Sequence, residues 1–138
     1  MVLIVEDDSE MRSLLRDELW GEGYQLKEAR DGEEALRVAR DSPPDLILSD
    51  LKMPGGGVEY VSRLRRSVPN CPLVLMTAFG DAKLRADVLA SGATVYFDKP
   101  VHVKELKATI KRLLSPEVSG ERLEGTGKPV TGKGPLLL

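Results

Sequence analysis

The sequence predicts an α/β protein in which five strands alternate with five helices around a parallel sheet. Short, continuous apolar runs recur along most of the chain, and stretches with helical spacing separate them. Continuous apolar runs are typical of strands that are buried on both faces, as in a parallel sheet. Because connections between parallel strands are right-handed, helices are expected on both faces of the sheet, which gives three layers.

Four of the expected strands are clear and one is weaker. The clear runs are rich in β-branched and large aliphatic residues and cover residues 2–5, 46–48, 73–76 and 94–97. The weaker run covers residues 24–27 and supplies the second strand in chain order.

The expected helices lie between these runs and after the last of them. The second helix has a plausible N-cap in Asp31, with Glu34 three residues later. The apolar face of each helix is marked in turn by Met11, Leu14, Leu15 and Leu19; by Ala35, Val38 and Ala39; by Val61, Leu64 and Val68; by Leu84, Val88 and Leu89; and by Val103, Leu106, Ile110, Leu113 and Leu114.

Composition narrows the class of protein. A formal charge of −2 argues against direct binding of nucleic acid, which normally needs a basic face. The first apolar run is too short for a signal peptide or a membrane span. The single cysteine, Cys71, allows no internal disulfide and suits a reducing compartment. We therefore expect a cytoplasmic protein without membrane contact.

The chain divides into two parts. Residues 1–114 are expected to form one domain, whereas residues 115–138 contain five glycines and three prolines without periodicity. This composition predicts a flexible tail or an interdomain linker. The closing Leu136, Leu137 and Leu138 are unusual for a solvated tail, and we expect them to be candidates for docking on an apolar groove of this or another chain.

Polar side chains follow the expected strands where each strand ends. In open α/β sheets the ligand site lies beyond these carboxyl ends, at the switch point of strand order. The residues in question are Glu6, Asp7 and Asp8 after the first strand, Asp50 after the third, Thr77 after the fourth and Lys99 after the fifth.

These side chains suit phosphoryl transfer onto Asp50. Clustered carboxylates repel one another unless a cation lies among them, and oxygen ligands at a small open site favour Mg²⁺. Lys99 and Thr77 would contact phosphoryl oxygens. Taken singly, Asp7 or Asp8 could cap a helix and Asp50 could cap a turn. The combination at four strand ends is the stronger signal.

Four segments resemble the signature of the receiver domains of bacterial two-component response regulators. They are Val5-Glu-Asp-Asp-Ser-Glu-Met-Arg12, Leu48-Ser-Asp-Leu-Lys-Met-Pro54, Met76-Thr-Ala78 and Tyr96-Phe-Asp-Lys-Pro100. The resemblance covers residues 1 to about 114. It implies the flavodoxin-like fold of the chemotaxis regulator, with strand order 2-1-3-4-5, a fold to which the switch-point rule is known to apply.

The resemblance also implies a role for each site residue. Asp50 would accept the phosphoryl group from a phosphohistidine of a sensor histidine kinase. Mg²⁺ would be bound by Asp7, by Asp50 and by the backbone carbonyl of Lys52, with Glu6 acting through water. Glu6 and Asp7 correspond to the acid pair of the family because of the position of Arg12, which leaves Asp8 outside the site.

The other implied roles concern the phosphorylated state. Thr77 and Tyr96 resemble the switch pair, in which the hydroxyl moves to the phosphoryl group and the ring turns inward. Lys99 resembles the lysine that contacts phosphate, and its peptide bond to Pro100 is expected to be cis. Lys52 and Phe79 occupy positions that influence access of water to the acyl phosphate.

One departure from the family pattern is visible. The segment Pro54-Gly-Gly-Gly57 is one residue shorter than is usual before the third helix and contains only glycine after the proline. We expect a mobile loop there.

The implied function is a phosphorelay switch rather than an enzyme, with self-catalysed phosphoryl transfer and dephosphorylation only. Phosphorylation would change the surface of the fourth helix, fifth strand and fifth helix. That surface would control a downstream effector or a fused output domain, or form a homodimer.

Four other functions compete with this one. One keeps the fold and uses the receiver only as a docking surface, but the presence of Asp7, Asp50, Thr77 and Lys99 argues against it. The segment from Thr77 to Asp81 resembles receivers of DNA-binding transcriptional regulators, which makes an N-terminal receiver fragment the main alternative. An aspartyl-nucleophile phosphohydrolase usually carries a second acid at the position of Lys52. A dinucleotide-binding module is disfavoured because no G-x-G-x-x-G motif follows the first strand.

Overall fold

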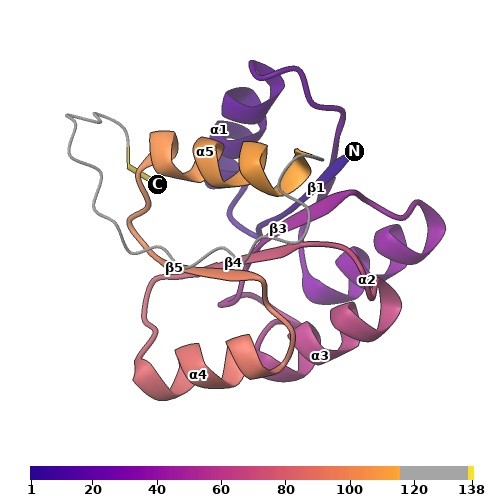
Figure 1. Ribbon diagram of the computed structural model, residues 1–138, viewed down its shortest axis with the longest axis vertical. Helices are drawn as coiled ribbons and strands as arrows, with labels where there is room; N and C mark the ends of the chain where they lie inside the picture. The colour runs from indigo at the N-terminus through magenta and orange to yellow at the C-terminus, as the bar shows by residue number, and fades with distance from the viewer. Residues whose placement is uncertain (116–136) are drawn as a thin grey trace.

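The computed structural model describes residues 1–115 and 137–138 of the chain. Five parallel strands form one sheet in the order β2-β1-β3-β4-β5, which confirms the predicted fold class (Figure 1). The strands are β1 (Val2–Val5), β2 (Leu26–Ala29), β3 (Leu46–Asp50), β4 (Leu73–Thr77) and β5 (Val95–Asp98).

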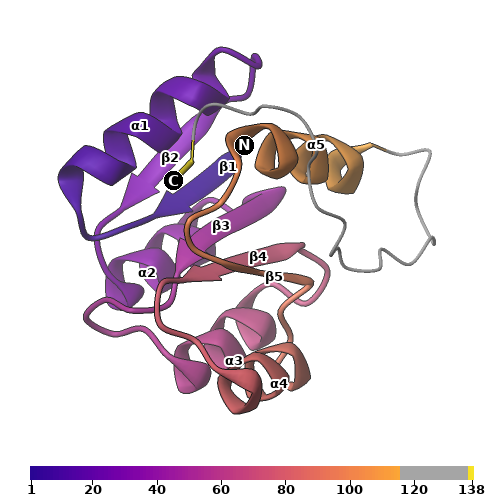
Figure 2. The same ribbon diagram turned by 90° about the vertical axis from the view of Figure 1, so that its left-hand side faces the viewer.

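Five helices cover the two faces of the sheet. They are α1 (Ser9–Trp20), α2 (Gly32–Asp41), α3 (Val58–Ser67), α4 (Ala82–Ala90) and α5 (Val103–Leu114). α1 and α5 lie on one face, and α2, α3 and α4 lie on the other (Figures 1 and 2). The arrangement is the predicted three-layer sandwich.

The sheet divides the apolar interior into two cores because side chains along a strand alternate between its faces. Leu3 and Val5 of β1 pack with α2 and α3, whereas Val2 and Ile4 pack with α1 and α5. All residues of β1, β3 and β4 are buried, as the continuous apolar runs predict.

Several predicted boundaries need correction. β2 comprises Leu26–Ala29 rather than residues 24–27, because these residues pair in register with Val2–Val5 of β1. β3 continues to Asp50, which pairs with Met76 of β4. Local patterns mark the apolar centre of a strand, but pairing with the neighbouring strand sets its ends.

The fourth helix is less buried than its sequence pattern predicts. Val88 is fully buried, but Leu89 is 40% exposed although helical spacing predicts that the two share the apolar face. α4 lies at the end of its layer, against α3 and over the edge strand β5. A large part of its surface therefore faces outward.

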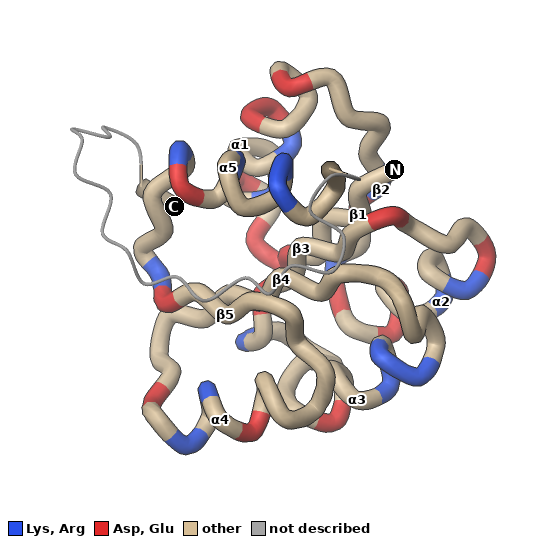
Figure 3. Tube along the Cα trace, in the orientation of Figure 1, with Lys and Arg blue, Asp and Glu red and all other residues tan. Residues whose placement is uncertain are grey.

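Acidic and basic residues are interspersed over the helices (Figure 3). Among the described residues, no helix has the length and apolar character needed to cross a membrane.

Candidate functional site

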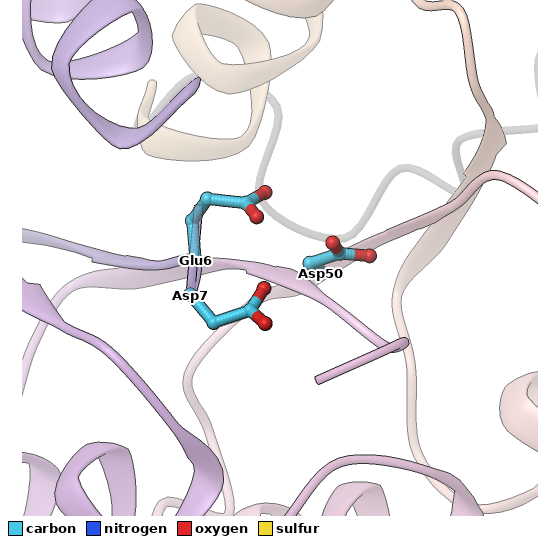
Figure 4. Close-up of side chains that lie close together, drawn as sticks. All are labelled: Glu6, Asp7 and Asp50. Carbon is cyan, nitrogen blue, oxygen red and sulfur yellow. The ribbon is translucent and has the colours of Figure 1, made fainter. Parts of the chain in front are cut away.

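Three carboxylates converge at the carboxyl ends of β1 and β3. Glu6 and Asp7 directly follow β1, and Asp50 is the last residue of β3. One carboxylate oxygen of each lies within 4.8 Å of the others. Figure 4 shows the three side chains directed toward a common space. The oxygen-rich corner predicted from the strand ends is therefore formed.

Asp8 does not join this group, because its side chain caps α1. Its Oδ1 accepts hydrogen bonds from the amides of Glu10 at 2.9 Å and Met11 at 3.2 Å. An N-cap side chain satisfies amides that the first helical turn leaves free. From the sequence, either Asp7 or Asp8 could cap the helix. In the structure Asp8 caps α1 and Asp7 belongs to the carboxylate cluster.

Lys99 is the cation of the cluster among the described residues. Its Nζ donates to Asp50 Oδ2 at 3.2 Å and to Glu6 Oε1 at 3.3 Å. Burial disfavours the charged Lys99, but the charges of Asp50 and Glu6 and the hydrogen bonds to both raise its pKa above the usual value. Lys99 is therefore charged at neutral pH. Its peptide bond to Pro100 is cis.

Asp50 is held in a defined orientation. Its Oδ1 accepts from the amide of Leu51 at 2.7 Å and from the amide of Lys52 at 3.3 Å, while its Oδ2 accepts from Lys99. The residue is only 5% exposed. These contacts orient the carboxylate at the end of β3.

The proton affinity of Glu6 reflects its burial and its charged neighbours. Its burial, and next the charge of Asp50, raise its pKa to about 7, although the amide of Asp8 and the charge of Lys99 lower it. One ammonium does not offset three convergent carboxylates. A divalent cation with oxygen ligands, such as Mg²⁺, fits this donor set and this charge deficit.

Thr77 is the last residue of β4, and Tyr96 lies within the neighbouring strand β5. Thr77 Oγ1 and Tyr96 Oη are buried and make no hydrogen bond within the described residues. The ring of Tyr96 is only 7% exposed, and burial is the main reason that its pKa rises to about 12. The Thr77 hydroxyl therefore retains free hydrogen-bonding capacity inside the molecule, whereas Asp98 lies close enough to Tyr96 to contribute to its raised pKa.

Comparisons with known proteins agree with this geometry. The model of the response regulator receiver domain matches residues 2–111. This chain belongs to the response regulator receiver family. It is the receiver domain of a response regulator, and such domains act in phosphorelay signalling as regulatory phosphoacceptors rather than as classical enzymes.

The chain matches a different fraction of the length of each relative. The chain is 36% identical over 88% of its length to the sensor histidine kinase TmoS of Ectopseudomonas mendocina, of which it spans 13%. It is 34% identical over 82% of its length to sporulation initiation phosphotransferase F of Bacillus subtilis, of which it spans 92%. Other relatives are transcriptional regulatory proteins, of which it spans 65% or less.

A solved structure supports the fold. The crystal structure of a two-component response regulator from Clostridium difficile superposes with a TM-score of 0.80 at 27% identity. The superposition covers 86% of this chain and 98% of that one.

Gly80 is a residue of the receiver that sequence reasoning did not single out. A Cβ at this position would collide with Tyr96 Oη and lie 2.9 Å from Thr77 Cγ2. Arg85 also contacts Tyr96, with its guanidinium carbon 5.4 Å from the ring centroid. The missing side chain at position 80 thus leaves room for the buried tyrosine. No local pattern marks a glycine whose neighbour is a side chain of a distant strand.

Arg12 also has a structural role in the receiver. Its Nη1 donates to the backbone carbonyl of Glu6 at 2.8 Å, and its Nε donates to Glu28 at 3.1 Å. In the sequence, Arg12 only indicated which acids form the pair. In the structure it connects the backbone at Glu6 to β2, next to Asp7.

A surface pocket of about 480 Å³ opens at Leu51 and Lys52, the two residues that follow Asp50 in the chain. It is lined by Leu51, Lys52, Met53, Gly56, Gly57, Phe79 and Leu84. Lys52 Nζ lies 5.4 Å from the centroid of the Phe79 ring, which is 79% exposed. The two residues expected to influence water access are therefore in contact, in a cation–π arrangement.

The glycine loop before α3 has a defined backbone. Gly55 and Gly57 have φ values of 75° and 102°, which favour glycine. The carbonyl of Pro54 accepts from the amide of Gly32 at 3.0 Å. Mobility of this loop stays a prediction.

Replacing Glu6 by glutamine is expected to alter the pH dependence of stability in metal-free protein. The pKa of Glu6 is raised from 4.5 to about 7, so the folded protein retains a proton that the unfolded chain releases in this interval. The stabilising contribution is present at low pH and is lost as the pH rises through this window. Glutamine keeps it.

The advantage of Glu6→Gln over the wild type is therefore expected to grow from about pH 5 to about pH 7.5, by an amount on the order of 2 kcal/mol. Urea unfolding in a chelator measures it at both pH values. A difference that does not change with pH would contradict the prediction.

Replacing Gly80 by alanine is expected to push the Tyr96 ring outward, because the added methyl group occupies the place of its hydroxyl. Nitration of tyrosines, located by peptide mass mapping, should then increase at Tyr96. Gly21→Ala is the matched control, since a Cβ there finds its nearest neighbour at 3.6 Å. Equal nitration of Tyr96 in wild type and Gly80→Ala would show that the ring does not depend on Gly80.

Proposed function

We propose that this receiver is a phospho-accepting switch in which Asp50 takes the phosphoryl group from a phosphohistidine of a sensor histidine kinase. The observation that supports it best is the double contact of Lys99 with Asp50 and Glu6 beside Asp7. A carboxylate is held next to a permanent cation in a carboxylate cluster that suits a divalent ion. Such a site favours the negative charge of a phosphoryl group.

In the transfer, a carboxylate oxygen of Asp50 forms a bond to phosphorus. The bond from phosphorus to the donor nitrogen breaks, and its electron pair stays on the imidazole. Lys99 neutralises charge on a phosphoryl oxygen, and the free hydroxyl of Thr77 donates a hydrogen bond to another. The product is an acyl phosphate on Asp50.

The metal ligands proposed are Asp7, Asp50 and the backbone carbonyl of Lys52, with Glu6 acting through water. When bound, Mg²⁺ supplies positive charge for the phosphoryl oxygens and orients the donor. The convergence of Glu6, Asp7 and Asp50 and the raised pKa of Glu6 support this assignment.

The signal would leave the site through Thr77 and Tyr96. The buried Thr77 hydroxyl, which has no hydrogen-bond partner among the described residues, and the buried Tyr96 support a switch in which Thr77 turns to the phosphoryl group and the position of Tyr96 follows. The surface formed by α4, β5 and α5 would then bind a partner. α4 suits this role because it is the least buried of the three helices in its layer.

Partners and setting belong to the same proposal. A sensor histidine kinase would be the donor, and an effector protein, a fused output domain or a second copy of the chain would read the surface. We propose a cytoplasmic location without nucleic acid or membrane contact. The alternative is the receiver of a DNA-binding transcriptional regulator, favoured by the relatives of which the chain spans only part.

The decisive experiment is incubation with acetyl phosphate and Mg²⁺, followed by intact mass measurement. One phosphoryl adduct is expected on the wild type and none on Asp50→Asn, because an amide is not an effective nucleophile toward phosphorus. Absence of an adduct on the wild type, with folding verified, would reject the proposal. An adduct on Asp50→Asn would move the acceptor elsewhere.

Replacing Lys52 by alanine is expected to shorten the lifetime of phosphorylated Asp50 several-fold. The side chain lies against Phe79 in the lining of the pocket that begins one residue after Asp50, so its removal is expected to open a path for water. The decay of the mass adduct after removal of acetyl phosphate measures the lifetime. The exposed Lys111→Ala is the control, and equal lifetimes for all three chains would contradict the expectation.

A further inference from the structure

The last two residues of the chain lie on the connection between β5 and α5. The amide of Leu138 donates to the carbonyl of Val101 at 2.7 Å, and the amide of Val101 donates to the backbone oxygen of Leu138 at 2.5 Å. Leu137 lies opposite His102 in an antiparallel bridge. Figure 1 shows the C-terminus beside this connection. The contact is a short, two-way backbone pairing.

The side chains of the two leucines have different environments. Leu138 is 5% exposed and belongs to the apolar core under α1 and α5, whereas Leu137 is 45% exposed. Alternation of an exposed and a buried side chain is typical of a strand that has one buried face. Val101 and Val103 are members of the same core, so an apolar seat accompanies the backbone groups of Val101 that pair with Leu138.

The position of this contact relates it to the carboxylate cluster. Val101 is two residues beyond Lys99, whose ammonium contacts Asp50. It also directly extends the segment after β5, which is an edge strand of the sheet.

We propose that the Val101–His102 segment is a strand-addition seat for an extended, leucine-bearing peptide segment, filled here by Leu137 and Leu138 of the same chain. Backbone pairing supplies the orientation, and the buried leucine supplies the selectivity. A partner with a similar segment would displace the leucines.

Hydrogen exchange of the Val101 amide in the full chain tests the seat. The amide is expected to be protected in the wild type and to exchange at least about tenfold faster in Leu138→Asp, because a carboxylate does not enter an apolar seat. Leu137→Asp is the matched control and should keep the protection, since that side chain is exposed. Amides of β3 and β4 report whether each variant is folded.

Two further measurements identify which segment fills the seat. A synthetic peptide of residues 134–138 at millimolar concentration is expected to restore protection of Val101 in Leu138→Asp. Protection in the wild type should not change with protein concentration; if it does, a second copy fills the seat and the intramolecular proposal is wrong. Equal exchange in wild type and Leu138→Asp would also overturn it. None of these readings depends on phosphorylation, so failure of the proposed function remains distinguishable.

Discussion

A chain in which methionine replaces Lys99 is expected to accept a phosphoryl group from acetyl phosphate at least about 100-fold more slowly than the wild type. Lys99 Nζ contacts Asp50 at 3.2 Å and Glu6 at 3.3 Å. Methionine retains much of the apolar stem but removes the charge that offsets both carboxylates and the incoming phosphoryl oxygens. The initial rate of adduct formation, followed by intact mass, measures the loss.

Two controls make the result specific to this lysine. Lys107→Met removes an ammonium that pairs with Glu18 and Glu22 and lies outside the carboxylate cluster. Urea unfolding of Lys99→Met separates a slow reaction from a loss of fold. A rate within a few-fold of the wild type, in a folded variant, would mean that Lys99 serves the structure and not the reaction.

Replacing Asp7 by asparagine is expected to weaken Mg²⁺ binding by about two orders of magnitude, because affinity at such sites follows the number of charged oxygen ligands. The exposed Asp7 carboxylate faces Glu6 and Asp50 and is the one of the three that is open to a hydrated ion. Calorimetric titration with Mg²⁺ at neutral pH gives the dissociation constants directly.

Asp8→Asn is the natural comparison for this variant. It changes the charge by the same amount one residue away, and asparagine is about as good an N-cap as aspartate, so α1 should be preserved. Unchanged binding in Asp8→Asn beside a large loss in Asp7→Asn is the expected pair of results. Equal losses in both variants would indicate a diffuse charge effect and would count against a ligand role for Asp7.

The sequence alone determined the order of elements and the set of residues at the strand ends. Continuous apolar runs and helical spacing are local properties, and the rule that parallel strands present their carboxyl ends together converts them into a shared site. For this reason the residue order is enough to group Asp50, Thr77 and Lys99. Their chemistry stays a proposal that the substitutions at Asp50 and Lys99 test.

Other features depended on contacts between distant parts of the chain. Cap geometry separated Asp8 from the carboxylate cluster, and strand pairing moved β2 by two residues. Position 80 has no room for a side chain only because the hydroxyl of Tyr96 in β5 occupies the place that a Cβ would take.

Tertiary structure also decided the electrostatics of the site. The pKa of Glu6 reflects its burial and the charge of Asp50, and it is lowered by Lys99, which is 93 residues away in the sequence. Residue types show which charges a chain carries. Only the folded arrangement decides how far those charges are removed from water and which of them meet, and these two quantities set the proton affinity of the site.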